Sequence, residues 1–320
     1  MNTAPCSGYP AHLALSVFTS TISAALCVIT ITGNLLICIA VLKDPQRKLR
    51  TPFMFIIVNL AITDLVVGVV TLPISVVTHA LEAMDKKTNS HVTISRMFYF
   101  MTVTASTFNL IAFCIDRFVA VSNPIKYRRI MSFRICVLLV FLIWMLSVGI
   151  ACIYIIVGYI DFIIVFAQIS VALVVVMCAI TTRLLRMLNQ KARKRTRLLA
   201  TPSALPTRQN ERVTLLFLTF LFTFLLCNTP AIIMMYLIKF YTTLDCTVRH
   251  IIRDLSFLFV VANSALNPFF CTIRLKPFHQ AIMIIFNRKQ DSTPSRTHSP
   301  LAKSNNVLRR SKNEKLASFN

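Results

Sequence analysis

Seven long apolar segments constrain the fold of this 320-residue chain more than any other feature. A helix needs about 20 predominantly apolar residues to cross the hydrocarbon core of a bilayer. The segments that reach this length span approximately residues 14–42, 53–79, 97–122, 135–157, 161–182, 213–238 and 251–273. Because 56% of the residues are hydrophobic and only 14% are charged, a soluble globule of this size could not bury them. We therefore predict an all-α, seven-transmembrane helix bundle.

The fourth and fifth segments almost touch, with Gly158 near their junction. A single helix over residues 135–182 would be about 70 Å long, more than twice the thickness of the hydrocarbon core. Two spans joined by a tight turn at Gly158 fit the sequence better.

The distribution of charge supports seven spans independently. The chain carries 34 Lys and Arg against 11 Asp and Glu, a net charge of +23. With seven spans, 28 basic residues fall on the side of the C-terminus and 6 on the opposite side. Because cytoplasmic loops are enriched in Lys and Arg, we expect an extracellular N-terminus and a cytoplasmic C-terminus. The excess positive charge then indicates which side of the membrane is cytoplasmic and a surface there for a partner. Binding of nucleic acid is not needed to explain it.

This topology divides the chain into four regions. Residues 1–13 form an extracellular N-terminus, and residues 14–273 form the membrane domain. Residues 274–287 are amphipathic and predict a helix on the membrane surface. Residues 288–320 are rich in Ser, Thr, Lys and Arg, which predicts a disordered cytoplasmic tail that receptor kinases could phosphorylate to recruit arrestin.

Polar side chains at membrane depth are the first candidates for function. Asp64 is the one carboxylate in the sequence that falls deep in the predicted bundle. Asn263 and Asn267 are four residues apart and share a helix face. Pro268 cannot donate a hydrogen bond to the carbonyl of Ser264, which leaves a polar backbone group available near these side chains.

These and other landmarks together resemble the rhodopsin-like (class A) G-protein-coupled receptors. In chain order the matching residues are Gly33, Asn34, Leu60, Ala61, Asp64, Asp116, Arg117, Phe118, Trp144, Phe224, Cys227, Pro230, Asn267 and Pro268. The resemblance runs from the first span to the short helix after the seventh. It implies a plasma-membrane receptor that activates heterotrimeric G proteins, with membrane lipid and a small-molecule or peptide ligand as further partners.

In this family an allosteric sodium ion lies in the middle of the bundle. The positions that match its site here are Asp64, Ser106, Asn263, Ser264 and Asn267. A buried carboxylate is costly unless it is protonated or paired with a cation, and hard cations prefer oxygen ligands. The alternative is an uncharged hydrogen-bonded network that only fixes helix packing.

The resemblance also assigns a cytoplasmic activation switch to Arg117, which would pair with Asp116 and with Glu211 in the resting state. Outward movement of span six would then release the guanidinium to support G-protein binding. Further residues of the activation relay are Phe224, Cys227, Pro230 and Pro268. The simpler alternative for Arg117 is a side chain that reaches toward the membrane interface.

Two departures from the family pattern indicate a subgroup. Val92 stands where most members have the cysteine that ties span three to the second extracellular loop, and the fifth span lacks its usual proline. Both departures resemble the melanocortin receptors and their adenosine- and cannabinoid-type relatives. That resemblance implies a Cys6–Cys246 disulfide between the N-terminus and the third extracellular loop, with two free thiols as the alternative.

The inward faces of the spans predict a mainly apolar ligand pocket. Its candidate residues, each of which packing alone could also explain, are Tyr99, Val103, Asn228, Ala231, Ile232, Met235 and Phe257. Tyr99 stands where amine receptors of the family carry an aspartate, so no ammonium anchor is expected there.

We expect a receptor rather than an enzyme, because the sequence contains no HExxH or GxSG motif and no intramembrane pair of acids. One alternative is a transporter in which Asp64 binds a coupling ion. Another is a receptor-like protein with impaired signalling, because Asn228 and Cys271 replace the usual tryptophan of span six and tyrosine of span seven.

Overall fold

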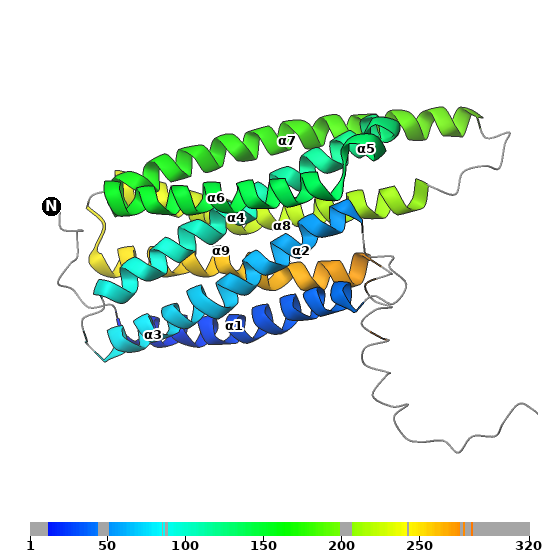
Figure 1. Ribbon diagram of the computed structural model, residues 1–320. Helices are drawn as coiled ribbons and strands as arrows, with labels where there is room; N and C mark the ends of the chain where they lie inside the picture. Colours follow the sequence, from blue (N-terminus) through cyan, green and yellow to red (C-terminus); the bar gives the residue numbers. More distant parts are fainter. Residues whose placement is uncertain are drawn as a thin grey trace, which may run out of the picture. The chain divides into compact units, whose positions relative to one another are not determined.

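The computed structural model describes residues 12–43, 51–84, 86, 89–198, 207–241, 243–275, 278 and 283, apart from the side chains of 89–91, 128, 159–161, 192, 194–198 and 207–212. Within these residues all regular structure is helical. The helices belong to the compact unit Met1–Ile282 and run side by side along a common direction (Figure 1).

Seven stretches of the described chain are helical, long and apolar enough to cross a membrane, as predicted. In chain order they are α1 (Leu13–Leu42), then α2 (Pro52–Val66) continued by the π-helix η1 (Val67–Thr71) and α3 (Leu72–Ala83), α4 (Asn89–Ser122), α6 (Phe133–Val157), α7 (Tyr159–Leu198), α8 (Thr207–Phe240) and α9 (Cys246–Arg274). The predicted all-α seven-helix bundle is therefore confirmed. Among the described residues one further helix, α5 (Pro124–Ile130), lies between α4 and α6 and was not predicted.

Several helices extend beyond the apolar segments from which they were predicted, and two of these extensions lie beside a cavity. The second span continues to Ala83 instead of ending near residue 79, and α4 begins at Asn89 instead of near residue 97. The added turns carry Glu82 and Arg96, which hydropathy assigns to loops. The structure places both side chains on the wall of a cavity, so the helices continue past the apolar core.

A single glycine connects α6 to α7. Gly158 has φ 89° and ψ 165°, a backbone conformation that strongly favours glycine because an L side chain would clash with the main chain. Its amide bonds to the carbonyl of Tyr154, and its carbonyl accepts from the amide of Phe162, so both helices end without a loop. The predicted tight turn at Gly158 is confirmed. We call the end of the bundle that carries this turn the Gly158 end, and the opposite end the α5 end.

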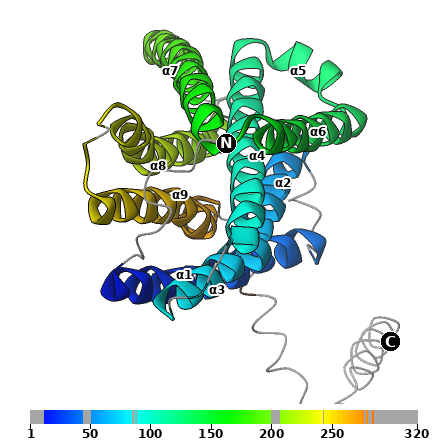
Figure 2. The same cartoon turned by 90° about the vertical axis from the view of Figure 1, so that its left-hand side faces the viewer.

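Helix α4 is the central element of the bundle. It packs against α2, α3, η1, α6, α7 and α8, and Figure 2, which looks along the helices, shows the others arranged around it. By contrast, α6 and α7 turn large apolar side chains outward, such as Phe141, Met145 and Val175, each more than half exposed. Outward apolar and inward polar surfaces are what a bilayer environment requires.

Several predicted regions fall wholly or mostly outside the described residues. They are the N-terminus up to residue 11, most of the amphipathic segment 274–287, and the tail 288–320, so those predictions stand as they are.

Candidate functional site

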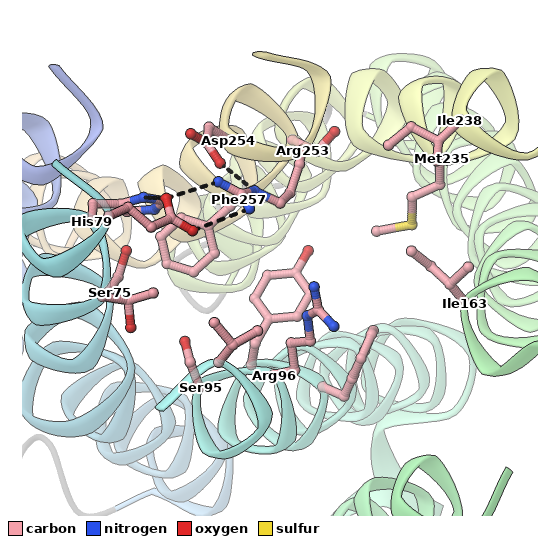
Figure 3. A pocket seen from close by; sticks show the side chains of 16 residues that line it. Ser75, His79, Ser95, Arg96, Ile163, Met235, Ile238, Arg253, Asp254 and Phe257 are labelled. Atoms are coloured by element: carbon pink, nitrogen blue, oxygen red, sulfur yellow. Dashed lines mark hydrogen bonds and ion pairs between the residues drawn. The ribbon is translucent and has the colours of Figure 1, made fainter. Parts of the chain in front are cut away.

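A cavity of about 100 Å³ opens at the Gly158 end, between α3, α4, α7, α8 and α9 (Figure 3). We call it the outer compartment. Its walls are formed by Ser75, Thr78, His79, Glu82, Val92, Ser95, Arg96, Tyr99, Phe100, Ile163, Met235, Ile238, Arg253, Asp254, Ser256 and Phe257. Five of these side chains belong to Asp, Glu, His or Arg residues and are of both signs, so this compartment can recognise charge.

Four of the ionisable residues form what we call the ion cluster: His79, Glu82, Arg253 and Asp254. The guanidinium of Arg253 donates to both carboxylate oxygens of Glu82, at 3.3 and 3.1 Å, and through Nε to Asp254 at 2.6 Å. Nδ1 of His79 lies 3.0 Å from Glu82 Oε2. Figure 3 shows His79 of α3 and Arg253 and Asp254 of α9 close together on one wall of the cavity. The cluster therefore joins α3 to α9 by charge-assisted hydrogen bonds.

The ion cluster was not predicted, because hydropathy assigns these charges to the water-exposed ends of the spans. A signal was present in the adjacent Arg253 and Asp254, which lie within an otherwise apolar helix and require partners.

Two smaller cavities, each of about 20 Å³, lie deeper in the bundle, and we call them together the inner compartment. One is lined by Val67, Tyr99, Thr102, Val103, Ser106, Phe224, Asn228, Val260, Val261, Asn263 and Ser264. The other is lined by Tyr99, Val103, Thr107, Phe166, Ala167, Ser170, Val174, Phe224, Asn228, Ala231, Ile232, Met235 and Val260. Neither lining contains an ionisable acid or base among Asp, Glu, His, Lys and Arg, in contrast to the outer compartment.

The predicted pocket residues are thus brought together, but in two compartments. Six of the seven line the second inner cavity, namely Tyr99, Val103, Asn228, Ala231, Ile232 and Met235. Phe257 lines only the outer compartment among these three cavities. Tyr99 lines all three, and Met235 lines the outer compartment and one inner cavity.

Asp64 is fully buried and is held by α9. Nδ2 of Asn267 donates to its Oδ2 at 2.8 Å, and the side chain of Ser264 also interacts with the carboxylate. Among the described residues, no hydrogen-bond partner is found for Oδ1 of Asp64 or for Oδ1 of Asn263. Ser106, Asn263 and Ser264 line the adjacent inner cavity. Of the predicted set, Asn267 and Ser264 thus contact the carboxylate, and Ser264 shares a cavity with Ser106 and Asn263. Two buried oxygens can accept a cation or a donor.

At the α5 end, Arg117 is buried and held in place by two residues. Its Nε donates to Asp116 Oδ2 at 2.7 Å, with a second contact from Nη2 to the same oxygen. Tyr127 on α5 donates its hydroxyl to Asp116 Oδ1 at 2.8 Å and accepts from Arg117 Nη2 at 3.3 Å. The Arg117 guanidinium also lies over the ring of Phe53 at 5.0 Å. The interfacial alternative for Arg117 does not fit a side chain only 5% exposed.

Tyr127 is a member of this group that the sequence analysis missed. The signal was the short helix that carries it: the side chain of Asn123 accepts from the amide of Lys126 at 3.2 Å and caps α5, which turns Tyr127 back toward Asp116. Burial, and next the negative charge of Asp116, raise the pKa of Tyr127 far above its usual range, so the phenol keeps its proton. Glu211, the other predicted partner of Arg117, lies outside the described side chains.

The predicted relay residues lie inside the bundle. Phe224 and Cys227 are buried on α8, and Pro230 and Pro268 lie inside α8 and α9. Asn228 donates through Nδ2 to the carbonyl of Phe224 at 2.9 Å. This bond is local to α8, so Asn228 helps to fix the wall of the inner compartment.

Cys246, at the start of α9, is disulfide-bonded, whereas Cys6 lies outside the described residues. The cysteines described as free thiols are Cys27, Cys38, Cys114, Cys136, Cys152, Cys178, Cys227 and Cys271.

Seven membrane-spanning helices, a cavity at one end and a buried Asp–Arg–Tyr group at the other define a multi-pass membrane protein of the seven-helix receptor class. The sequence pattern of the 7 transmembrane receptor (rhodopsin family) matches residues 33–270, and the chain belongs to this family.

Individual relatives match shorter stretches. A dopamine D2-like receptor of Drosophila melanogaster is 35% identical over 126 residues, 38% of this chain and 13% of the relative. A histamine H2 receptor of Rattus norvegicus is 35% identical over 137 residues, 42% of this chain and 37% of the relative. Olfactory receptor 1A2 of Homo sapiens is 36% identical over 121 residues, 37% of this chain and 38% of the relative. The chain thus spans well under half the length of these relatives, whose names do not point to the melanocortin-type subgroup.

Proposed function

We propose that the chain is a plasma-membrane receptor that binds an extracellular ligand in the cavity at the Gly158 end and activates heterotrimeric G proteins at the α5 end. The Gly158 end would face outside, in agreement with the excess of basic residues on the other side. The observation that carries the proposal is the burial of Arg117 by Asp116 and Tyr127 at the end opposite the cavity.

The proposed mechanism is a shift between two conformations. In the conformation described here, Arg117 has its charge neutralised by Asp116 and its position fixed by Tyr127. A ligand that binds better to a conformation with α8 moved outward favours release of the Arg117 guanidinium toward a G protein. The loss of buried charge-assisted hydrogen bonds opposes this release, so the resting state predominates without ligand.

A G-protein dissociation panel in transfected cells tests the proposal, with Arg117→Ala as the control for coupling. We expect basal or evoked coupling to at least one Gα class, lost in Arg117→Ala at equal surface expression. Absence of coupling to every class at normal surface expression would overturn the proposal and favour the receptor-like protein with impaired signalling. Uptake of a labelled substrate that depends on Asp64 would favour the transporter. Phosphorylation of the tail and arrestin recruitment can be followed in the same cells.

We further propose that Asp64 binds a sodium ion with Ser106, Asn263, Ser264 and Asn267. The buried Oδ1 atoms of Asp64 and Asn263, which lack described donors, support this because a hard cation prefers such oxygens. Sodium would supply the positive charge that a fully buried carboxylate requires. The three helices that carry these residues, α2, α4 and α9, would then be held in the resting arrangement.

Thermal unfolding of the purified receptor in sodium or in potassium chloride at equal ionic strength tests the ion site. We expect a higher Tm in sodium for the wild type and no difference for Asp64→Asn. Equal Tm values in both salts for the wild type would favour the uncharged hydrogen-bonded network instead.

We also propose that the chain belongs to the melanocortin-type subgroup and that Cys6 and Cys246 form a disulfide. Val92 in place of a cysteine and the single-residue α6–α7 connection support this placement, and the bonded state of Cys246 supports the Cys6–Cys246 disulfide. Peptide mapping without reduction would detect a crosslinked pair of peptides containing Cys6 and Cys246. Recovery of both peptides as alkylated free thiols would exclude the disulfide.

A further inference from the structure

We infer that Tyr99 divides the ligand site into two compartments of different chemistry, so that the ligand class is amphiphilic. A charged or zwitterionic head group would occupy the outer compartment, and an uncharged apolar tail would reach the inner compartment by displacing the Tyr99 ring. This inference rests on the proposed function as a ligand-binding receptor and specifies what such a ligand must carry.

The contrast between the two linings is the first observation. The outer compartment presents the ion cluster and Arg96, whereas the inner cavities present aliphatic and aromatic side chains with a few neutral polar groups such as Ser170 and Asn228. Transfer of a charged group into an uncharged, buried cavity is strongly unfavourable, while transfer of an apolar group is favourable. The part of a ligand that enters the inner compartment must therefore be uncharged.

The position of Tyr99 is the second observation. It lines the outer compartment and both inner cavities, so its side chain stands at their common boundary. The residue is only 8% exposed, and its ring packs at 5.7 Å from the ring of Phe257 and 5.3 Å from that of Phe100. Figure 3 shows Phe257 on the wall of the outer compartment that carries the ion cluster.

The surroundings of Tyr99 indicate that the ring, and not the helix, must move to open the boundary. Phe100, the next residue, is fixed by edge contacts with Phe162 at 4.7 Å and Phe166 at 5.1 Å on α7. Helix α4 is uninterrupted from Asn89 to Ser122, and Thr102 and Thr104 donate to the carbonyls of Tyr99 and Phe100 one turn earlier. A side-chain rotation that breaks the Tyr99–Phe257 contact is the smallest change that joins the compartments.

Cysteine accessibility tests this inference without an identified ligand. Val103→Cys places a thiol of similar volume in the inner compartment, and Ser95→Cys places one in the outer compartment. The full-length receptor in lipid nanodiscs is treated with two methanethiosulfonates of similar length, a neutral hydroxyethyl reagent and a cationic trimethylammonium-ethyl reagent. Modification rates at positions 95 and 103 are read from peptide masses, with the parent receptor giving the background of its native cysteines.

We expect both reagents to modify position 95 at comparable rates. At position 103 the neutral reagent should react at least about tenfold faster than the cationic one. Tyr99→Ala should raise the neutral rate at position 103 by about tenfold or more, whereas Tyr99→Phe, which keeps the ring, and Thr104→Ala, which lies off the three cavities, should not. Tyr99→Leu serves as a second variant that retains apolar packing if Tyr99→Ala fails to fold.

Equal rates of the two reagents at position 103 would overturn the uncharged character of the inner compartment. An unchanged neutral rate at position 103 in both Tyr99→Ala and Tyr99→Leu would overturn the role of Tyr99 as the boundary. Neither result depends on G-protein coupling, so failure of this inference and failure of the proposed function are distinguishable.

Discussion

The side-chain amide of Asn34 on α1 donates a hydrogen bond of 3.2 Å to the main-chain carbonyl of Ser264 on α9. This carbonyl is the one that Pro268, four residues later, cannot satisfy within the helix. Asn34 is fully buried and also donates to the carbonyl of Thr30 in its own helix. The proline break in α9 is thus compensated by a side chain from a different span, as membrane helices require.

Removing this amide should destabilise the bundle more when the proline is present than when it is replaced. Asn34→Ala leaves the Ser264 carbonyl without a donor, and we expect a loss of about 1 kcal/mol in the free energy of unfolding. Pro268→Ala restores a backbone amide, so Asn34→Ala should cost less in that background. A double-mutant cycle from denaturant unfolding of the purified receptor measures the difference, and additive effects would contradict the link. Thr32→Ala, an exposed position on α1, is the control.

Gly33 allows α1 to approach the same proline closely. A Cβ atom at this position would lie 2.8 Å from Cγ and 2.9 Å from Cβ of Pro268. Gly33→Ala should therefore push α1 from α9 and cost about 1–3 kcal/mol of stability, which appears as a lower Tm. Gly149→Ala on α6, where a Cβ meets nothing within 4 Å, should leave Tm unchanged or raise it. An equal decrease in Tm in both variants would show that the loss does not come from the contact with Pro268.

Removing the hydroxyl of Tyr127 should raise basal signalling. Tyr127→Phe keeps the ring but deletes the bond to Asp116 of 2.8 Å, which weakens the group that holds Arg117. One such bond contributes about 0.5–1.5 kcal/mol, so basal G-protein activation should rise by roughly two- to tenfold. Because the pKa of Tyr127 is raised, the phenol stays protonated and this effect should not vary with cytoplasmic pH between 6 and 8. Unchanged basal activity at equal expression would contradict the prediction.

The ion cluster should contribute to stability through Arg253. Arg253→Ala leaves Glu82 and Asp254 without their cation, and since Glu82 is only 14% exposed we expect a loss of about 1–3 kcal/mol. Adding Glu82→Gln to this variant should recover part of the loss, because one unpaired charge is removed. Thermal unfolding of the single and double variants checks the prediction. If the double variant were less stable than Arg253→Ala, the unpaired Glu82 carboxylate would not be the cause of the lost stability.

The number of spans and the polar centre of the bundle were predictable from the sequence. Length and hydropathy determine the spans because a bilayer requires both, and a residue such as Asp64 at membrane depth requires partners. The free carbonyl before Pro268 was predictable from proline chemistry, although the identity of its donor, Asn34, was not. A donor from another span depends on how helices pack, which one sequence does not specify.

The ends of the spans and the walls of the cavity were not predictable in the same way. Hydropathy placed Glu82 and Arg96 in loops, because it counts each charge as if it faced water. In the fold Glu82 is neutralised by Arg253, a residue 171 positions away in the chain. Tyr127 was missed for a related reason, since only the capped helix α5 turns it back toward Asp116.

The glycine that replaces a loop between α6 and α7 has a mechanical consequence. Consecutive Cα atoms are held about 3.8 Å apart, so the ends of the two helices on either side of Gly158 cannot separate. Tyr154 before the glycine and Phe162 after it pack their rings together at 5.7 Å, which further couples the two ends. A ligand that draws the Gly158 end of α7 toward the cavity must therefore also move the adjoining end of α6.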